Sequence, residues 1–202
     1  MHTDRVTMAQ LLAGAVGRTL PDIVGPDLDV LFCGINPSRY SAAAGHHFAR
    51  PGNRFWPTLH RSGFTPRRLD PSEDHLLPGF GLGVTNLVAR ATARADELTP
   101  PELVAGGARL VRLAAACRPR WIAVVGVTAY RLAFDQRRAL VGPRPESLGG
   151  ARLWVLPNPS GAQCPLPARP ARRRVRPAAA GGGGRTATVG DYWWRAIRSR
   201  IS

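Results

Sequence analysis

Four short apolar runs are spaced between Leu28 and Leu156. Each is rich in Val, Leu or Ile, as strands buried on both faces of a sheet tend to be. Helical patterns separate the runs, and strands that alternate with helices form a parallel sheet. The sequence therefore predicts an α/β fold, a three-layer α/β/α sandwich with a short central parallel sheet. The four predicted strands are residues 28–33, 83–88, 121–125 and 153–156.

The clearest helix signal begins at Thr99, which is followed by two prolines and then by Glu102. Thr and Glu at this spacing form a capping box, and proline is favoured in the first helical turn. Apolar residues then recur on one face as far as Cys117. Further helices are expected after the capping pair Asp70 and Glu73, and over residues 8–16 and 127–134.

Basic residues outnumber acidic residues by 28 to 13, and every one of them is arginine. The resulting charge of +15 favours an anionic partner, with nucleic acid as the first candidate. Arginine without lysine, together with many Gly, Pro and Ala residues, is also typical of codon bias in a GC-rich genome. Part of the positive charge is therefore mutational in origin.

The chain of 202 residues, 44% of them hydrophobic, is long enough for one domain with a real core. No apolar run approaches the about 20 residues of a membrane span, and the N-terminus lacks a signal-peptide pattern. We therefore expect a cytoplasmic protein with no membrane partner. Cys33, Cys117 and Cys164 lie far apart, which excludes a four-cysteine metal site within one chain and indicates reduced thiols.

The composition changes abruptly after Gly161. Residues 162–202 contain nine arginines and one aspartate, so they carry +8 of the total charge, and they include several prolines and a run of four glycines. Apolar periodicity is missing until residues 192–194. We interpret residues 1–161 as the folded domain and residues 162–202 as a basic tail that is largely disordered.

Three of the four asparagines lie on or just beyond predicted strands: Asn36, Asn86 and Asn158. Ligands of open parallel sheets bind beyond the carboxyl ends of the strands, so these side chains are expected to converge on one cleft. The alternative interpretation is that the two Asn-Pro sequences, at Asn36 and Asn158, simply begin turns.

Four motifs carry a resemblance to a known family. In order they are Gly34-Ile35-Asn36-Pro37, Phe48-Ala49-Arg50-Pro51-Gly52-Asn53-Arg54-Phe55-Trp56, Gly83-Val84-Thr85-Asn86-Leu87-Val88 and Leu156-Pro157-Asn158-Pro159-Ser160-Gly161. Their order and spacing resemble those of the bacterial mismatch-specific uracil-DNA glycosylases and their thymine-DNA glycosylase relatives. The resemblance implies a monofunctional glycosylase that removes uracil and related bases from duplex DNA, chiefly opposite guanine, with the choice among uracil, thymine and ethenocytosine left open. We expect a monomer.

The resemblance assigns Asn36 to positioning the water that attacks the sugar. Sugar-bond hydrolases usually supply a carboxylate for this water, whereas the turn at residues 34–37 offers only a carboxamide. A carboxamide orients water but does not accept its proton at neutral pH. We therefore expect a slow hydrolase that needs no metal and no cofactor and that acts mainly by stabilising the departing base.

The same resemblance places Gly34, Ile35, Phe48 and Asn86 around the flipped base. Phe48 matches the aromatic residue that stacks on the base, and the backbone N–H groups of Ile35 and Phe48 match donors to its carbonyls. Asn86 is expected to read the polar edge of the base. The alternatives are that Phe48 packs in the core and that Asn86 caps a strand end. Asn53 is expected to cap a helix anchored by Phe55 and Trp56.

The segment Asn158, Pro159, Ser160 and Gly161 matches the loop that enters the DNA minor groove. The family often has a bulky apolar wedge next, where this chain has Ala162. One back-translation of residues 162–168, read from its second base, encodes Leu-Asn-Ala-His-Tyr-Gln, which places a leucine directly after Gly161. The hypothesis is therefore that residues 162–202 are a frameshifted reading, and the alternative is a lineage-specific basic tail.

Two other classes of function remain as alternatives. The first is a basic nucleic-acid-binding protein without catalysis, and the second is a nucleotide-binding or hydrolytic α/β enzyme unrelated to DNA. Neither needs the Asn36 and Asn158 turns, and nucleotide hydrolysis requires a phosphate loop or metal carboxylates. His46 and His47 have no third metal ligand at suitable spacing, so they are interpreted as loop surface near the pocket.

Overall fold

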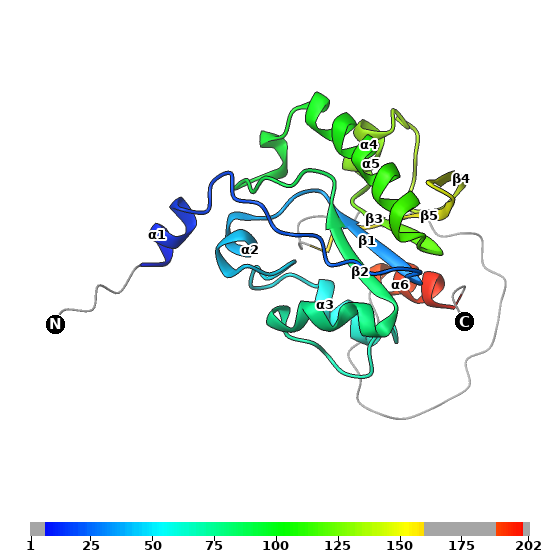
Figure 1. Cartoon of the computed structure of the whole chain (residues 1–202), viewed down its shortest axis with the longest axis horizontal. Coiled ribbons are helices and arrows are strands. Elements are labelled where there is room, and N and C mark those ends of the chain that lie inside the picture. Colours follow the sequence, from blue (N-terminus) through cyan, green and yellow to red (C-terminus); the bar gives the residue numbers. More distant parts are fainter. Residues whose placement is uncertain (1–6, 160–188, 200–202) are drawn as a thin grey trace.

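The computed structural model describes residues 7–159 and 189–199. Its centre is a five-stranded sheet in the order β2-β1-β3-β5-β4 (Figure 1). Neighbours among β2, β1, β3 and β5 pair in parallel, which confirms the four predicted strands. These strands span Val30–Gly34 (β1), Leu82–Asn86 (β2), Trp121–Val125 (β3) and Ala151–Leu156 (β5).

The sequence did not indicate the fifth strand, β4 (Gly142–Leu148), which pairs antiparallel with β5 and makes the sheet mixed. The strand contains two prolines and two charged residues, a pattern that favours a loop. β4 lies at the edge of the sheet. Proline is tolerated there because the outward-facing N–H positions of an edge strand have no partner in the sheet. Gly149 and Gly150 connect β4 to β5 in left-handed backbone conformations, as a tight hairpin requires.

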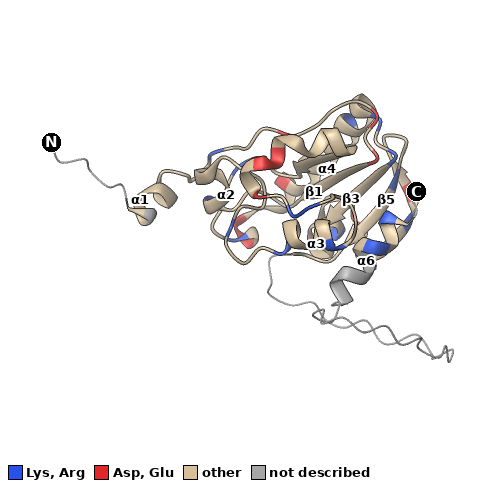
Figure 2. Ribbon diagram, turned by 90° about the horizontal axis from the view of Figure 1, so that it is seen from below, with Lys and Arg blue, Asp and Glu red and all other residues tan. Residues whose placement is uncertain are grey.

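Helices cover both faces of the sheet, which confirms the predicted three layers (Figure 2). One face is covered by α4 (Pro100–Cys117) and α5 (Val127–Ala133). The capping box predicted at Thr99 is present, since its N–H donates to the Glu102 carboxylate at 2.8 Å. Buried Leu103 and Leu110 of α4 then pack against the sheet residues Ile122, Val124, Leu153 and Val155.

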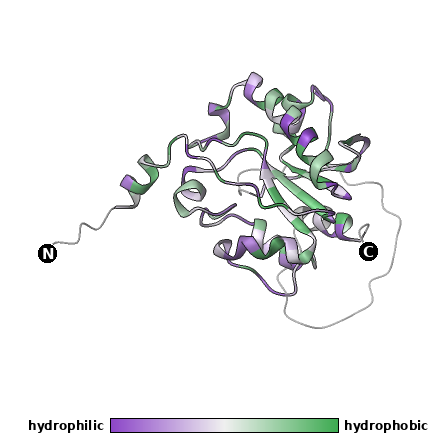
Figure 3. Cartoon of the chain, viewed as in Figure 1, coloured by the Kyte–Doolittle hydropathy of each residue, from purple (hydrophilic) through white to green (hydrophobic). Residues whose placement is uncertain are grey.

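The other face is covered by α3 (Phe55–Arg61), the 3₁₀ helix η1 (Pro71–Phe80) and α6 (Val189–Arg198). The strands between the two layers are the most hydrophobic part of the molecule (Figure 3). On this face Phe32 of β1 meets Phe55 edge-on and stacks with Trp194 of α6, at ring-centroid distances of 5.6 Å and 5.1 Å.

The prediction of a disordered tail is wrong for α6. Trp194 and Ile197 lie three residues apart, one helical turn, and both are buried against the sheet. The composition of the preceding segment obscured this short apolar face. The boundary predicted at Gly161 therefore excluded a part of the folded domain, while residues 160–188 lie outside the described part of the chain.

The remaining elements lie toward the carboxyl ends of the parallel strands or at the N-terminus. They are α1 (Met8–Ala13), α2 (Arg39–Ala44) and the 3₁₀ helix η2 (Ala95–Glu97). Cys33 and Cys117 are buried free thiols, and Cys164 lies outside the described residues. Within the described ranges no helix has the length and apolar character needed to cross a membrane.

Candidate active site

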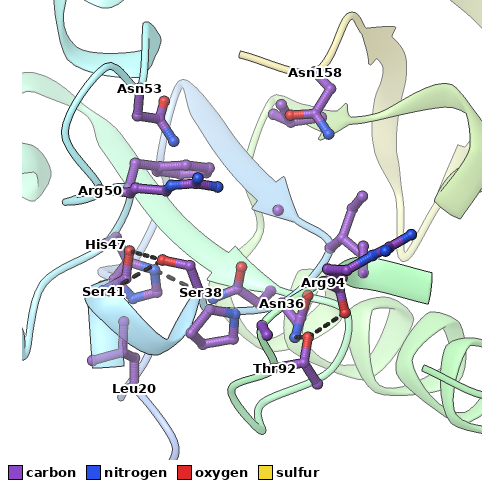
Figure 4. Close-up of a pocket in the computed structure, with 18 residues that line it drawn as sticks. Leu20, Asn36, Ser38, Ser41, His47, Arg50, Asn53, Thr92, Arg94 and Asn158 are labelled. Carbon is purple, nitrogen blue, oxygen red and sulfur yellow. Dashed lines mark hydrogen bonds between the residues drawn. The ribbon is translucent and has the colours of Figure 1, made fainter. Parts of the chain in front are cut away.

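A cavity of about 360 Å³ lies at the carboxyl ends of the parallel strands (Figure 4). Gly34 of β1, Asn86 of β2, Val125 of β3 and Asn158 after β5 all line it. The sequence predicted this convergence for the three asparagines that follow strands. Arg50 and Arg94 also line the cavity and give it positive charge, and no Asp or Glu occurs among the described residues that line it.

The carboxamide of Asn36 is held in one orientation. Its Nδ2 donates to the carbonyl oxygen of Arg90 at 3.0 Å and to Oγ1 of Thr92 at 2.8 Å. Both hydrogens of the amide nitrogen Nδ2 are therefore engaged, and the carbonyl oxygen Oδ1 lies at the opposite end of the carboxamide. Oδ1 accepts no hydrogen bond from the described part of the chain and is the acceptor that Asn36 offers to a water.

Thr92 is a site residue that the sequence analysis missed. Its hydroxyl is buried and donates to the carbonyl oxygen of Arg94 at 2.6 Å. Because the single hydroxyl hydrogen is used there, Oγ1 can only accept from Asn36 Nδ2. Thr92 therefore fixes which end of the Asn36 carboxamide faces the cavity. Its sequence signal is weak, since a threonine in a loop has no pattern of its own.

Phe48 packs in the core, which is one of the two alternatives left open by the sequence, and it also lines the cavity. The residue has a left-handed backbone, with φ of 53°, and its ring stacks on Phe55 at a centroid distance of 4.0 Å and an interplanar angle of 12°. The same side chain is only partly buried and lines the cavity. Core packing thus holds the aromatic ring rigid where a planar base would stack on it.

Gly34 leaves space between Phe48 and Asn86. A Cβ at this position would lie 2.5 Å from Oδ1 of Asn86 and 3.3 Å from the Phe48 ring. Ile35, the next residue, also lines the cavity. Glycine is therefore required at the end of β1 for the carboxamide and the aromatic ring to approach the same small volume.

The backbone of Asn86 is anchored from behind the sheet. The Arg109 guanidinium forms an ion pair with Asp22 and donates to the carbonyl oxygen of Asn86 at 3.0 Å. Thr85 donates its hydroxyl to Asp22 at 2.6 Å and accepts from Arg109. This network explains how a residue at a strand end keeps a fixed position beside the cavity, and it was not predicted.

His47 lies near the pocket as expected, but the interpretation that it is surface is wrong. Its side chain is buried and lines the cavity beside Asn86, with Nδ1 3.3 Å from Asn86 Nδ2. His46 is partly exposed and pairs with Asp74. The burial of His47 depends on Pro21, 26 residues earlier in the chain, whose carbonyl oxygen lies 2.9 Å from Nε2. Local sequence carries no signal of such a contact.

Comparison with known families agrees with this geometry. A family model described as "Uracil DNA glycosylase superfamily" matches residues 21–174, which is more than half of the chain. The chain belongs to the uracil DNA glycosylase superfamily. Members of this superfamily are hydrolases that act on DNA, and they are glycosylases that remove uracil.

The cavity brings together the partly buried Phe48 ring, the Asn86 side chain and the oriented carboxamide of Asn36. Among the described residues no three His, Cys, Asp or Glu side chains are grouped as a metal site requires. The chemistry that these side chains can supply is positioning and electrostatic stabilisation.

The segment of residues 158–161, which the sequence resemblance assigns to DNA binding, is described only in part. Exposed Asn158 lines the cavity opposite Asn36, and the carbonyl oxygen of Pro159 accepts from the N–H of Arg54 at 3.0 Å. The N-cap residue of α3 is Arg54, not Asn53 as expected; Asn53 lies one residue earlier, and its Oδ1 accepts from the N–H of Phe55 in the first turn at 2.9 Å. Ser160, Gly161 and Ala162 lie outside the described residues.

Proposed function

We propose that the protein is a monofunctional DNA glycosylase that hydrolyses the N-glycosidic bond of uracil mispaired with guanine in duplex DNA, with thymine and ethenocytosine as further candidate bases. The role is base excision repair. The observation that carries the proposal is the Asn36 carboxamide, whose nitrogen is bound by Arg90 and Thr92 while its oxygen is left for a water.

In this mechanism the extruded uracil stacks on Phe48, and its polar edge contacts Asn86. Asn36 Oδ1 accepts one hydrogen of a water and orients its lone pair toward the anomeric carbon. The C–N bond breaks as negative charge grows on the departing base. Arg50 and Arg94 at the cavity, with the backbone N–H groups of Ile35 and Phe48 that the resemblance assigns as donors, would stabilise that charge.

In this mechanism the water adds to the sugar after the sugar has become cationic, and its proton passes to the departed base anion or to solvent, because no described side chain lining the cavity is a carboxylate that could take it earlier. The enzyme is accordingly slow. The absence of lysine from the whole sequence supports a monofunctional enzyme, since strand cleavage through a Schiff base needs an amine nucleophile.

An excision assay tests the proposal. The full-length protein, in excess, is incubated with end-labelled duplexes that contain G:U, A:U, G:T, G:ethenocytosine or G:C, and with single-stranded DNA containing uracil. We expect alkali-labile sites at the uracil of G:U, fewer in A:U, and no strand cleavage before alkali. Binding of the duplexes without any alkali-labile site would instead support the non-catalytic nucleic-acid-binding alternative.

A further inference from the structure

The hydrogen bonds of His47 define its tautomer. Nε2 lies 2.9 Å from the carbonyl oxygen of Pro21, which can only accept, so the ring proton is on Nε2. Burial is the largest influence on this imidazole and lowers its pKa, so the ring is neutral at pH 7. In the neutral ring Nδ1 then carries a lone pair and is an acceptor.

The acceptor Nδ1 determines the orientation of Asn86. The nearest polar atom of Asn86 lies 3.3 Å from Nδ1 and must be a donor, which makes it Nδ2. The other end of the carboxamide, Oδ1, then lies over Gly34, at 2.5 Å from the place that a Cβ would occupy. Asn86 therefore presents an acceptor to the cavity floor.

We infer that His47 is a positioning residue whose Nε2–H tautomer holds the Asn86 carboxamide with Oδ1 toward the base. This orientation suits uracil and thymine, whose ring nitrogen N3 carries a hydrogen, and opposes cytosine, whose N3 is an acceptor. The inference rests on the proposed function, because the discrimination matters only if a base enters this cavity. It assigns the selectivity to a histidine that does not itself need to touch the base.

Protonation of His47 would reverse the arrangement. A hydrogen on Nδ1 would face the donor Nδ2, so the carboxamide would have to rotate and present Nδ2 to the base. The charged groups around the ring are Asp74, which accepts from the His47 backbone N–H at 3.0 Å, Asp22 and His46. Both carboxylates favour the protonated ring, but burial outweighs them, so the change occurs only in acid, below the ordinary pKa of histidine.

The first test needs no substitution. In ¹⁵N-labelled full-length protein at neutral pH, we expect a protonated Nε2, an unprotonated Nδ1, and a coupling across the hydrogen bond from the Asn86 amide to His47 Nδ1. A proton on Nδ1 at neutral pH would overturn the inference. This result is independent of activity, so it decides the orientation of Asn86 even if no base is excised and the proposed function fails.

The second test is a double-mutant cycle on single-turnover excision from G:U duplex. We expect His47→Leu to slow excision roughly 10-fold when Asn86 is present, and by less than about twofold in the Asn86→Ala background, because His47 acts through Asn86. His60→Gln is the control, since His60 also contacts a carbonyl, of Thr65, but lies on α3 outside the cavity lining. It should excise at the parent rate.

Equal losses from His47→Leu in both backgrounds would show that His47 acts independently of Asn86 and would overturn the inference. Should His47→Leu fail to fold, the rate of the parent protein as a function of pH replaces it. We then expect uracil excision to fall on acidification together with protonation of Nδ1 in the NMR spectra. Excision that stays constant while Nδ1 becomes protonated would equally overturn the inference.

Discussion

Asn36 and Thr92, which both line the cavity, show that a single hydroxyl group can fix the orientation of a carboxamide. Asn36 has defined chemistry because Thr92, 56 residues later, accepts from its nitrogen. An asparagine whose two ends exchanged would present donor and acceptor to the water in turn. Its average effect on the direction of the lone pair of that water would be small.

Replacing the Thr92 hydroxyl tests this dependence. Thr92→Val keeps the shape but removes the acceptor for Asn36 Nδ2 and the donor to Arg94. We expect the single-turnover rate to fall roughly 10-fold, which is about 1.4 kcal/mol of barrier, with DNA affinity unchanged. Thr92→Ser, which restores the hydroxyl, should recover most of the rate. Failure of serine to restore it would indicate a packing role.

The sequence predicted those site residues that follow strands or match motifs: Asn36, Phe48, Asn86 and Asn158 all line the cavity. It did not predict Thr92 or His47. Each of these two acts through contacts with residues far away in the chain, and both are polar residues in loops, where local pattern indicates surface. Their roles depend on hydrogen-bond direction, which becomes visible only when both partners are placed.

At the level of elements, patterns that depend on local physics were reliable. The capping box at Thr99 and the β-rich apolar runs defined α4 and four strands correctly. The predictions failed for β4, where proline is tolerated only because the strand is at an edge, and for α6, where two buried side chains suffice to dock a helix. Both outcomes were decided by tertiary position.

The docking of α6 leads to a stability prediction. Trp194 is 2% exposed and stacks on Phe32, so Trp194→Ala should lower the free energy of unfolding by about 3–5 kcal/mol. Arg195→Ala, on the exposed face of the same helix, is the matched control and should change it little. Urea unfolding monitored by fluorescence and circular dichroism measures both. Equal stabilities for the two variants would show that α6 does not pack on the sheet.

At the scale of the whole molecule, the positive charge is unevenly distributed along the sequence. Residues 162–202 carry +8, and α6 within this segment is part of the core, so truncation after Gly161 would remove folded structure. Substitution of arginines between Gly161 and α6 tests whether they attract DNA without removing α6. The remaining +7 lies in residues 1–161, which contain the cavity.

The triple substitution of Arg172, Arg173 and Arg174 by Gln should reduce the salt slope of DNA binding. If each arginine neutralises one phosphate, the slope of log K against log salt falls by about 3 units. The base that is excised should not change if these arginines contribute only non-specific attraction to phosphates. Affinity titrations at several salt concentrations, with excision assays at matched occupancy, check both statements. A loss of preference for uracil would contradict the account.

The frameshift hypothesis for the segment after Gly161 stays a prediction, and it concerns residues outside the described part of the chain. The buried face of α6 restricts it, since a frameshift that continued through residues 189–198 would have to produce a fitting helix by coincidence. The coding DNA tests it. A second frame that encodes leucine directly after Gly161 and stays open would support the hypothesis, whereas early stops in that frame would refute it.

If Asn36 orients the attacking water, then removing its carboxamide should slow the chemical step. Single-turnover excision of uracil from G:U duplex should fall roughly 100-fold or more in Asn36→Ala, which is about 2.7 kcal/mol of barrier, while DNA affinity is retained. Gln136→Ala removes an exposed carboxamide outside the cavity lining and should keep the parent rate. Equal rates for Asn36→Ala and the parent at saturating enzyme would show that Asn36 does not orient the attacking water.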